Sequence, residues 1–202
     1  MKIIVFEGLD KSGKHTASLD FEKQLISQGY LVAKMEFPQY DTPIGQLISD
    51  WLHKKLDVDA HTFELLLAAD KQSAQTKIQE FKDAGYDYLI MDRYIHSQLA
   101  YGSYDNDISW VEMLIKYACK PDFVIYMDVS PDESMKRRGQ HGDNDRYESD
   151  YKRLSNMRDA YNKAFTMTDI GDHLIRIDAN QSLSDVRASV ALVADHISSI
   201  LE

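Results

Sequence analysis

The chain has 202 residues, 44% of them hydrophobic, which is enough to bury the core of one domain, and its formal net charge of −10 argues against broad binding to nucleic acids or anionic membranes. Its single cysteine, Cys119, excludes an intrachain disulfide and a cysteine-based metal site. The N-terminus lacks a signal-peptide pattern and no stretch approaches 18 apolar residues, so we expect a cytoplasmic protein without a membrane segment.

Short apolar runs alternate with amphipathic segments along the N-terminal half of the chain. KIIVFE at 2–7 ends at a glycine turn and predicts a buried strand. Apolar residues then recur at helical spacing over 17–28, before a glycine that suits a helix end. LVAKMEF at 31–37 predicts a second strand, and Thr42-Pro43 is typical of a helix start, which predicts a helix through IGQLISDWL.

The same alternation continues to the C-terminus. Further strands are predicted at 86–91, 123–129 and 173–178. Further helical patterns cover 61–83, 95–118 (one or two helices), 131–138 and 147–165, and Ser182-x-x-Asp185 is a capping box for a last helix. Strands separated by helices imply βαβ crossovers, so we expect an α/β fold with a five-stranded parallel sheet flanked by helices.

Ligands of such sheets bind at the carboxyl ends of the strands, so the segments that follow strands are where chemistry is expected. These segments are 8–16, 36–42, 92–97 and 129–147. The first, within FEGLDKSGKHT, nearly matches the phosphate-binding loop pattern G-x-x-x-x-G-K-[ST]. Glycines let backbone N–H groups turn toward phosphate oxygens, and the lysine can reach the β- and γ-phosphates. We therefore predict a nucleotide site formed by Gly8, Leu9, Asp10, Lys11, Ser12, Gly13, Lys14, His15 and Thr16.

His15 departs from the pattern because it occupies the Ser/Thr position, whose hydroxyl normally binds Mg²⁺. Imidazole is a poor ligand for this ion, which prefers hard oxygens. Three explanations stay open. Mg²⁺ is held by nucleotide oxygens, waters and acids, or Thr16 partly compensates, or catalysis is weak.

Two further segments carry charges suited to phosphates. Asp92 and Arg93 follow a predicted strand, where the carboxylate can hold a Mg²⁺ water shell and the guanidinium can clamp a phosphate bidentately. KRRGQHGDNDR at 136–146 contains two glycines and three arginines, and we expect it to close over a transferring phosphoryl group as a mobile lid at about 137–147. Its arginines are Arg137, Arg138 and Arg146.

In chain order, these segments resemble the thymidylate kinases, P-loop enzymes that move a phosphoryl group from ATP to dTMP. The similar segments are FEGLDKSGK, FPQYDTPIGQLISDWL, LLLAADKQ, DRYIHSQLAYG, KPDFVIYMDVSPDESMKRR, DRYE at 145–148 and MRDAY at 157–161. The resemblance implies a three-layer P-loop kinase sandwich over 1–202, with ATP and Mg²⁺ as cofactors and nucleotides as substrates. It also implies a homodimer, for which the apolar segment at 63–69 is a candidate interface.

The resemblance also implies roles for individual residues. Lys14, assisted by Lys11, would neutralise the β/γ-phosphate charge, and Arg93 would hold the acceptor's phosphate. The catalytic set would be Lys14, Asp10, Arg93, Lys11, Arg138 and Arg146, with Arg137 at the cofactor. The acceptor site would comprise Asp10, which faces the sugar, and Glu36, Pro38, Leu67, Lys71, Arg93, Ser97 and Tyr101. The metal site would comprise Asp92 and Thr16.

Four departures from the family pattern concern the acceptor. Glu36 stands where the family usually has an arginine that helps to bind the acceptor's phosphate. Leu67 replaces the phenylalanine that stacks on thymine, and Lys71 replaces the arginine that contacts the base edge, so a single donor takes the place of a planar fork. Gly102 removes a side chain that is polar in many members.

Because of these departures, two alternatives stay beside the monophosphate kinase. Related P-loop enzymes that phosphorylate a 5′-hydroxyl use a glutamate at the end of the second strand as general base, and Glu36 is close to that place, so a deoxynucleoside kinase is one alternative. A catalytically weak paralogue that only binds nucleotide is the other, and His15 with Glu36 favours it. The sequence does not choose among the acceptors.

Overall fold

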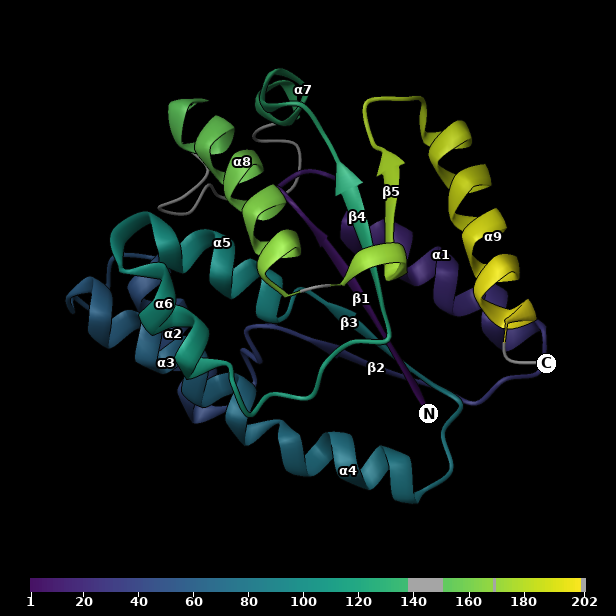
Figure 1. Cartoon of the computed structure of the whole chain (residues 1–202), viewed down its shortest axis with the longest axis horizontal. Coiled ribbons are helices and arrows are strands. Elements are labelled where there is room, and N and C mark those ends of the chain that lie inside the picture. The colour runs from purple at the N-terminus through teal and green to yellow at the C-terminus, as the bar shows by residue number, and fades with distance from the viewer. Residues whose placement is uncertain (138–150, 169, 201–202) are drawn as a thin grey trace.

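The computed structural model of the chain describes residues 1–137, 151–168 and 170–200. Within them, five strands form one parallel sheet in the order β2-β3-β1-β4-β5 (Figure 1). The strands are β1 (Lys2–Gly8), β2 (Val32–Glu36), β3 (Tyr88–Asp92), β4 (Phe123–Asp128) and β5 (Leu174–Asp178). The predicted strands and their parallel arrangement are therefore confirmed.

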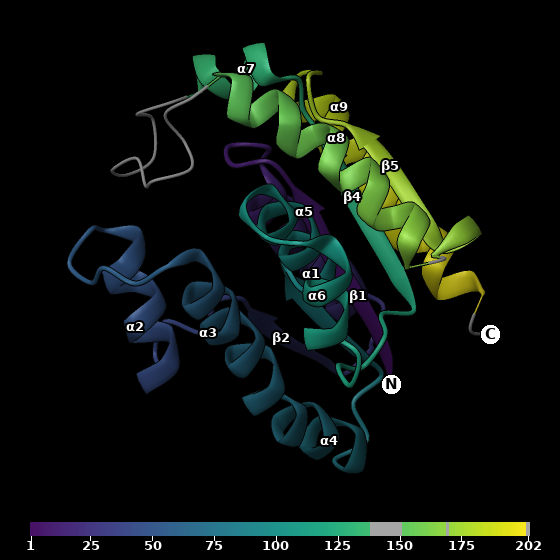
Figure 2. The same ribbon diagram turned by 60° about the vertical axis from the view of Figure 1, so that its left-hand side comes forward.

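Helices cover both faces of the sheet and make the structure three-layered. On one face lie α1 and α9, which pack against each other, and on the other lie α5 and α8 (Figure 2). The helices are α1 (Lys14–Ser27), α2 (Pro43–Leu52), α3 (Ala60–Ser73), α4 (Gln75–Asp83), α5 (Ile95–Asp105), α6 (Ile108–Leu114), α7 (Pro131–Lys136), α8 (Tyr151–Met167) and α9 (Leu183–Ser199), with a 3-10 turn at Gly171–His173. Among the residues described, none of these helices is long and apolar enough to cross a membrane.

The central strand β1 is buried on both faces, as its uninterrupted apolar sequence requires in a parallel sheet. Phe6 packs edge-on against Phe21 of α1, in the same cluster as Ile4. Ile3 and Val5 belong to the cluster on the opposite face, with Leu99 of α5. At its carboxyl end β1 therefore delivers Glu7 toward α5 and α8 and passes directly into the glycine loop.

The predicted helical pattern at 61–83 is divided between α3 and α4 at Ala74. The Ser73 hydroxyl donates to the Asp70 carbonyl at 2.8 Å, and the Gln75 side chain donates to the Lys71 carbonyl at 2.7 Å. Side-chain bonds of this kind compete with the helical ladder and bend helices, which hydrophobic spacing alone does not indicate. Apart from Arg137, the predicted lid at about 137–147 lies outside the described residues, as does the start of the predicted helix at 147–165. Arg138 and Arg146 are therefore not described.

A close backbone contact holds the segment after β2 against α2. Thr42 caps α2 as predicted, because its Oγ1 accepts from the Gly45 N–H at 3.0 Å. A Cβ atom added at Gly45 would lie 1.8 Å from the Gln39 carbonyl oxygen. Only glycine therefore permits this approach, and the approach fixes the course of residues 37–40.

We expect Gly45→Ala to destabilise the protein. Alanine is normally favoured over glycine inside a helix by about 1 kcal/mol, but here its methyl group would displace the Gln39 backbone, which typically costs about 1–3 kcal/mol. Urea denaturation followed by circular dichroism measures the free energy of unfolding. Ser49→Ala, on the same helix, is the control and should change it by less than about 0.5 kcal/mol. A raised midpoint for Gly45→Ala would show that the contact does not constrain the fold.

Candidate active site

A cavity of about 260 Å³ opens at the carboxyl ends of β1, β2 and β3. Nine of the residues assigned from the sequence to phosphate, acceptor or base contacts line it. They are Asp10, Lys14, Glu36, Pro38, Leu67, Lys71, Arg93, Ser97 and Tyr101. The structure thus brings together residues from four separate segments, while their roles remain predictions.

The glycine loop has the geometry of an anion cradle. Gly13, at φ +84°, precedes α1, and within the described chain no side chain caps that helix start. A Cβ atom at Gly8 would lie 2.7 Å from the Ser12 hydroxyl and 2.8 Å from the Met127 carbonyl, so this turn requires glycine. Lys14 folds back over the loop and donates to the Leu9 carbonyl at 3.4 Å. Uncapped N–H groups and a lysine at a helix start suit a phosphate group.

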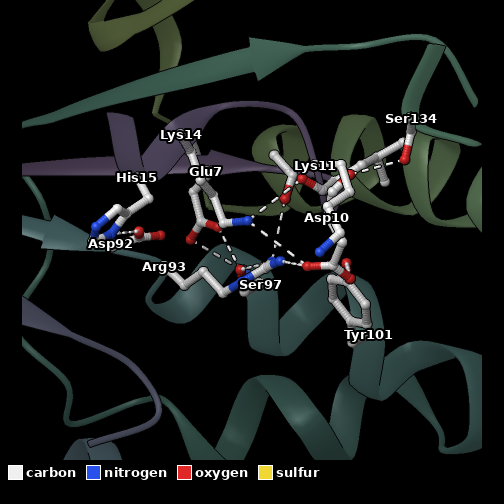
Figure 3. Close-up of polar contacts among 12 residues, drawn as sticks. Glu7, Asp10, Lys11, Lys14, His15, Asp92, Arg93, Ser97, Tyr101 and Ser134 are labelled. Atoms are coloured by element: carbon white, nitrogen blue, oxygen red, sulfur yellow. Dashed lines mark hydrogen bonds and ion pairs between the residues drawn. The ribbon is translucent and has the colours of Figure 1, made fainter. Parts of the chain in front are cut away.

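Asp10 lies between two cations (Figure 3). Its carboxylate forms an ion pair with Arg93, accepts from the Tyr101 hydroxyl at 3.3 Å and lies 3.8 Å from Lys14 Nζ. Burial acts to raise the pKa of Asp10, but Arg93 and Lys14 outweigh burial and hold that pKa below its ordinary value. Burial and the neighbouring Arg93 lower the pKa of Lys14. Two cations of the cavity, Lys14 and Arg93, therefore share one acid, Asp10, and the carboxylates of Glu36 and Asp92 line the cavity as well.

Arg93 adopts a left-handed backbone conformation, with φ +63°. Its N–H donates to the Phe6 carbonyl at 2.9 Å, and its Nη1 donates to the Gly8 carbonyl at 3.2 Å. The guanidinium also lies over the Tyr101 ring, 5.4 Å from the centroid. Although burial acts to lower the pKa of Arg93, Asp10 raises it well above its ordinary value. The arginine is thus permanently charged and held from several sides.

His15, rather than Thr16, contacts the predicted metal-site acid. Its Nδ1 lies 3.4 Å from Asp92 Oδ2, and the imidazole is largely exposed (Figure 3). Thr16 is exposed one residue further along α1. Asp92 supplies the hard carboxylate oxygen that Mg²⁺ prefers, so it fits that ion, whereas His15 competes for the same carboxylate. Within the described residues, no group of three or more His, Cys, Asp or Glu side chains that could hold a metal ion is found.

The cavity's apolar end is formed by Leu67 with Phe37 and Phe63. Lys71 is 4% exposed, lies 5.7 Å above the Phe37 ring and donates to the Leu67 carbonyl at 3.4 Å. Burial lowers the pKa of Lys71. Gln98 also lines the cavity, and its buried Oε1 has no hydrogen-bond partner among the described residues. One donor and one acceptor therefore line the cavity together with its apolar residues.

The departure at Gly102 has a structural reason. A Cβ atom there would lie 2.6 Å from the Glu64 carboxylate, so any side chain at 102 would displace this acid. Glu64 is 2% exposed, and burial raises its pKa to about 7. Glu64 thus fills the space that a polar side chain at position 102 would take.

Arg137, predicted at the cofactor, spans three segments of the fold. It donates to Glu133 Oε1 at 3.0 Å, to the Lys11 carbonyl at 3.3 Å and to the Ala179 carbonyl at 2.9 Å. The Ser134 hydroxyl donates to the Asp10 carbonyl at 2.8 Å. These bonds fasten the glycine loop to α7, and a contact between Arg137 and the nucleotide stays a prediction.

Several residues of the site were not foreseen from the sequence. Besides cavity-lining residues such as Phe37 and Phe63, four of them make polar contacts there or line the cavity with a polar group, namely Glu7, Gln98, Ser134 and Tyr161. For Glu7 a sequence feature was present, because it is a lone acid at the end of the apolar run KIIVFE. The other three belong to helices, where polar residues are common, and their spacing gives no comparable indication.

Comparisons with known proteins show which family the chain belongs to. A family model described as thymidylate kinase matches residues 6–190. The chain belongs to the thymidylate kinase family. It is 37% identical over 147 residues to the thymidylate kinase of Arabidopsis thaliana, a match that covers 72% of this chain and 55% of that protein. It is 34% identical over 149 residues to the human thymidylate kinase, covering 73% of this chain and 69% of that protein.

A match to the thymidylate kinase of Danio rerio is 30% identical over 203 residues, and it covers 99% of this chain and 92% of that protein. The solved structure of thymidylate kinase from Candida albicans superposes with a TM-score of 0.81 at 24% identity, covering 98% of this chain and 92% of that one. This likeness supports the three-layer fold. The expected membership of the thymidylate kinase family is therefore confirmed, and the departures at 15, 36, 67, 71 and 102 are features of a divergent member.

Replacing His15 by threonine, the residue type typical of a phosphate loop, should strengthen the Mg²⁺ dependence of ATP binding. The new hydroxyl is a harder ligand than imidazole, and Asp92 loses its competing contact. Calorimetric titration of ATP at several Mg²⁺ concentrations gives the affinities. Thr16→Val tests in parallel whether the neighbouring hydroxyl already serves the metal. A several-fold weaker affinity for Mg²⁺-ATP in His15→Thr would instead show that the imidazole itself binds the nucleotide.

Proposed function

We propose that this chain transfers the γ-phosphoryl group of ATP to the phosphate of dTMP, giving dTDP and ADP. The observation that carries the proposal is that Lys14 and Arg93 line one cavity and share one acid, Asp10. Phosphoryl transfer between two nucleotides needs two phosphate groups brought together with their negative charge neutralised. A lysine at the helix start and an arginine at the end of β3 supply a cation for each.

On this proposal the glycine loop and the start of α1 hold the ATP phosphates, with Lys14 at the β/γ-phosphates and Lys11 beside it. Arg93 binds the acceptor's phosphate, and Asp10 keeps both cations in place while it faces the acceptor's sugar. Asp92, with Thr16, would hold Mg²⁺, which neutralises phosphate charge when bound. Arg138 and Arg146, which we propose to act from a lid, lie outside the described residues.

The acceptor's base would lie between Leu67 and the polar pair Lys71 and Gln98. A lysine can donate to a keto oxygen, and an amide oxygen can accept from an imide N–H. This pattern suits a pyrimidine such as thymine, which offers O4 and N3–H. Leu67 contributes apolar contact without a π-face, so we expect weaker stacking than a phenylalanine gives.

The assay that tests the function uses the full chain with ATP and Mg²⁺ against dTMP, dUMP, other nucleoside monophosphates and free deoxynucleosides. We expect dTMP to have the highest kcat/KM. Phosphorylation of nucleosides but not of monophosphates would contradict the proposal, as would tight nucleotide binding without turnover on any acceptor.

The carboxylate of Glu36 should weaken binding of the acceptor's phosphate. Glu36 lines the cavity with Arg93 and pairs in register with Asp92 across β2 and β3. Its repulsion of a dianion is on the order of 1 kcal/mol or more. Glu36→Arg should therefore lower the KM for dTMP by about fivefold or more, as measured by steady-state kinetics.

Glu80→Arg is the matched control, because it makes the same charge change on the exposed α4 and should leave the KM for dTMP unaltered. The variant Glu36→Gln distinguishes a nucleoside kinase from a monophosphate kinase. A kcat reduced by on the order of 100-fold with acceptor binding intact would identify Glu36 as a general base acting on a hydroxyl.

We also propose that the chain forms a homodimer, as the family resemblance implies, and that it is cytoplasmic, as its sequence composition leads us to expect. Only part of the candidate interface at 63–69 is accessible to a second copy of the chain. Phe63 and Glu64 are buried within the chain itself, whereas Leu65 is 49% exposed. Sedimentation analysis of wild type and Leu65→Glu tests the assembly, since a charge at a buried interface should favour the monomer.

A further inference from the structure

Glu7 is a fully buried acid that accepts four hydrogen bonds. Its Oε1 accepts from the Tyr94 N–H at 2.9 Å and from the Ser97 N–H at 3.1 Å. Its Oε2 accepts from the Ser97 hydroxyl and, at 3.2 Å, from the Tyr161 hydroxyl. The acid projects from the end of β1 toward Ser97, which lines the cavity together with Arg93 (Figure 3).

The two backbone bonds make Glu7 the N-terminal cap of α5. The helix's own preceding residue, Tyr94, provides no side-chain cap, and Ser97 is the third residue of α5. A carboxylate that accepts N–H groups in the first turn satisfies unpaired donors and interacts favourably with the helix dipole. Because Arg93 immediately precedes this cap, the cap also fixes its left-handed backbone at φ +63°.

The two hydroxyls connect Glu7 to the Arg93 side chain. Arg93 Nη1 donates to Ser97 Oγ at 3.3 Å and to the Tyr161 hydroxyl at 3.1 Å. A guanidinium cannot accept a hydrogen bond, so each hydroxyl must use a lone pair toward Arg93 and direct its single proton elsewhere. The Ser97 hydroxyl can donate to Glu7 Oε2. The Tyr161 hydroxyl lies 2.8 Å from Ser97 Oγ, 3.2 Å from Glu7 Oε2 and 3.3 Å from the Gly8 carbonyl, so it reaches Glu7 either directly or through Ser97. The result is a buried hydrogen-bond network that links Arg93 to Glu7 through two hydroxyl groups. Burial raises the pKa of Glu7, while the bond from Ser97 and the charge of Arg93 oppose that rise.

We propose that Glu7 is a positioning residue for the phosphoryl acceptor, acting on Arg93 through Ser97 and Tyr161. These bridges hold Nη1 against the floor of the cavity and leave Nη2 directed toward Asp10 and the cavity. Because Tyr161 belongs to α8, the arginine's pose also depends on the docking of that helix, which a bidentate pair between Arg158 and Asp128 fastens to the end of β4. The inference rests on the proposed function, since Arg93 is taken to bind the acceptor's phosphate.

The test removes one bridge without moving the helix. Tyr161→Phe deletes the hydroxyl while keeping the ring in the core. Tyr126→Phe is the matched control, because Tyr126 is equally buried, its ring lies 5.3 Å from that of Tyr161, and its hydroxyl has no partner among the described residues. We expect Tyr161→Phe to raise the KM and the calorimetric Kd for dTMP about tenfold, since bonds to charged groups are the strong ones. The KM for ATP should stay within about twofold.

A double-mutant cycle shows whether Tyr161 acts through Glu7. Glu7→Gln alone should also weaken the binding of dTMP. In the double variant with Tyr161→Phe, the fold-increase in the Kd for dTMP should be clearly smaller than the product of the two single increases. A multiplicative effect, or equal dTMP affinity in Tyr161→Phe and Tyr126→Phe, would overturn the proposal. Thermal melts of each variant identify any loss that arises from unfolding.

Nuclear magnetic resonance of the arginine side chains tests the same bridge independently of activity. The Arg93 signal is assigned by its disappearance in Arg93→Lys. It should show slow proton exchange in wild type and Tyr126→Phe, and faster exchange in Tyr161→Phe. If wild type failed to phosphorylate dTMP while this difference held, the function would be wrong and the positioning role would stand. If exchange did not differ, the positioning role would be wrong whatever the substrate.

Discussion

The contact between Asp10 and Arg93 joins the two halves of the site. Asp10 belongs to the loop that follows β1, and Arg93 to the turn that follows β3, so the pair bridges neighbouring strands. Without the acid, Lys14 and Arg93 would face one another as like charges in a poorly solvated cavity, an arrangement that costs free energy. The acid therefore allows two cations to stand close together in one cavity, where we propose that the two phosphate groups meet.

Buried charges need partners of opposite sign, and this need also explains how the proposed acceptor site accommodates its unusual residues. Lys71 remains buried because carboxylates lie nearby, those of Asp70 and Glu64. Glu64 in turn occupies the space left by Gly102. Glu64 thus couples the replacements at 71 and 102. Restoring a side chain at 102 alone would displace Glu64 from Lys71, and replacing Lys71 alone would leave Glu64 without its cation. Glu36 differs because it is exposed at the rim, where water screens its charge.

Much of this architecture followed from the sequence because its causes are local. Strands such as 86–91 were predictable since a strand buried on both faces is apolar throughout, and the loop at 8–16 because its glycines and lysine have a fixed spacing. Contacts between distant segments were not predictable. The bonds from Arg137 to Lys11 and Ala179, or from Tyr161 to Glu7, depend on how helices dock, which no single-segment pattern contains. The division of the predicted helix at 61–83 into α3 and α4 was missed for a different reason. It accompanies hydrogen bonds from side chains to the backbone near Ala74, and hydrophobic periodicity does not reveal such bonds.

The cap that β1 provides for α5 couples local unfolding of this helix to that of the central strand. A helix capped by its own preceding residue can fray alone, but α5 depends for its first turn on a carboxylate from the central strand. Its first turn can open only by leaving that carboxylate buried without partners, which is costly. The start of α5 and the end of β1 should therefore belong to one cooperative unit that opens near the global limit of hydrogen exchange. The turn at Arg93, which we propose to bind the acceptor's phosphate, lies inside that unit, so its left-handed backbone is held even when surface loops fluctuate.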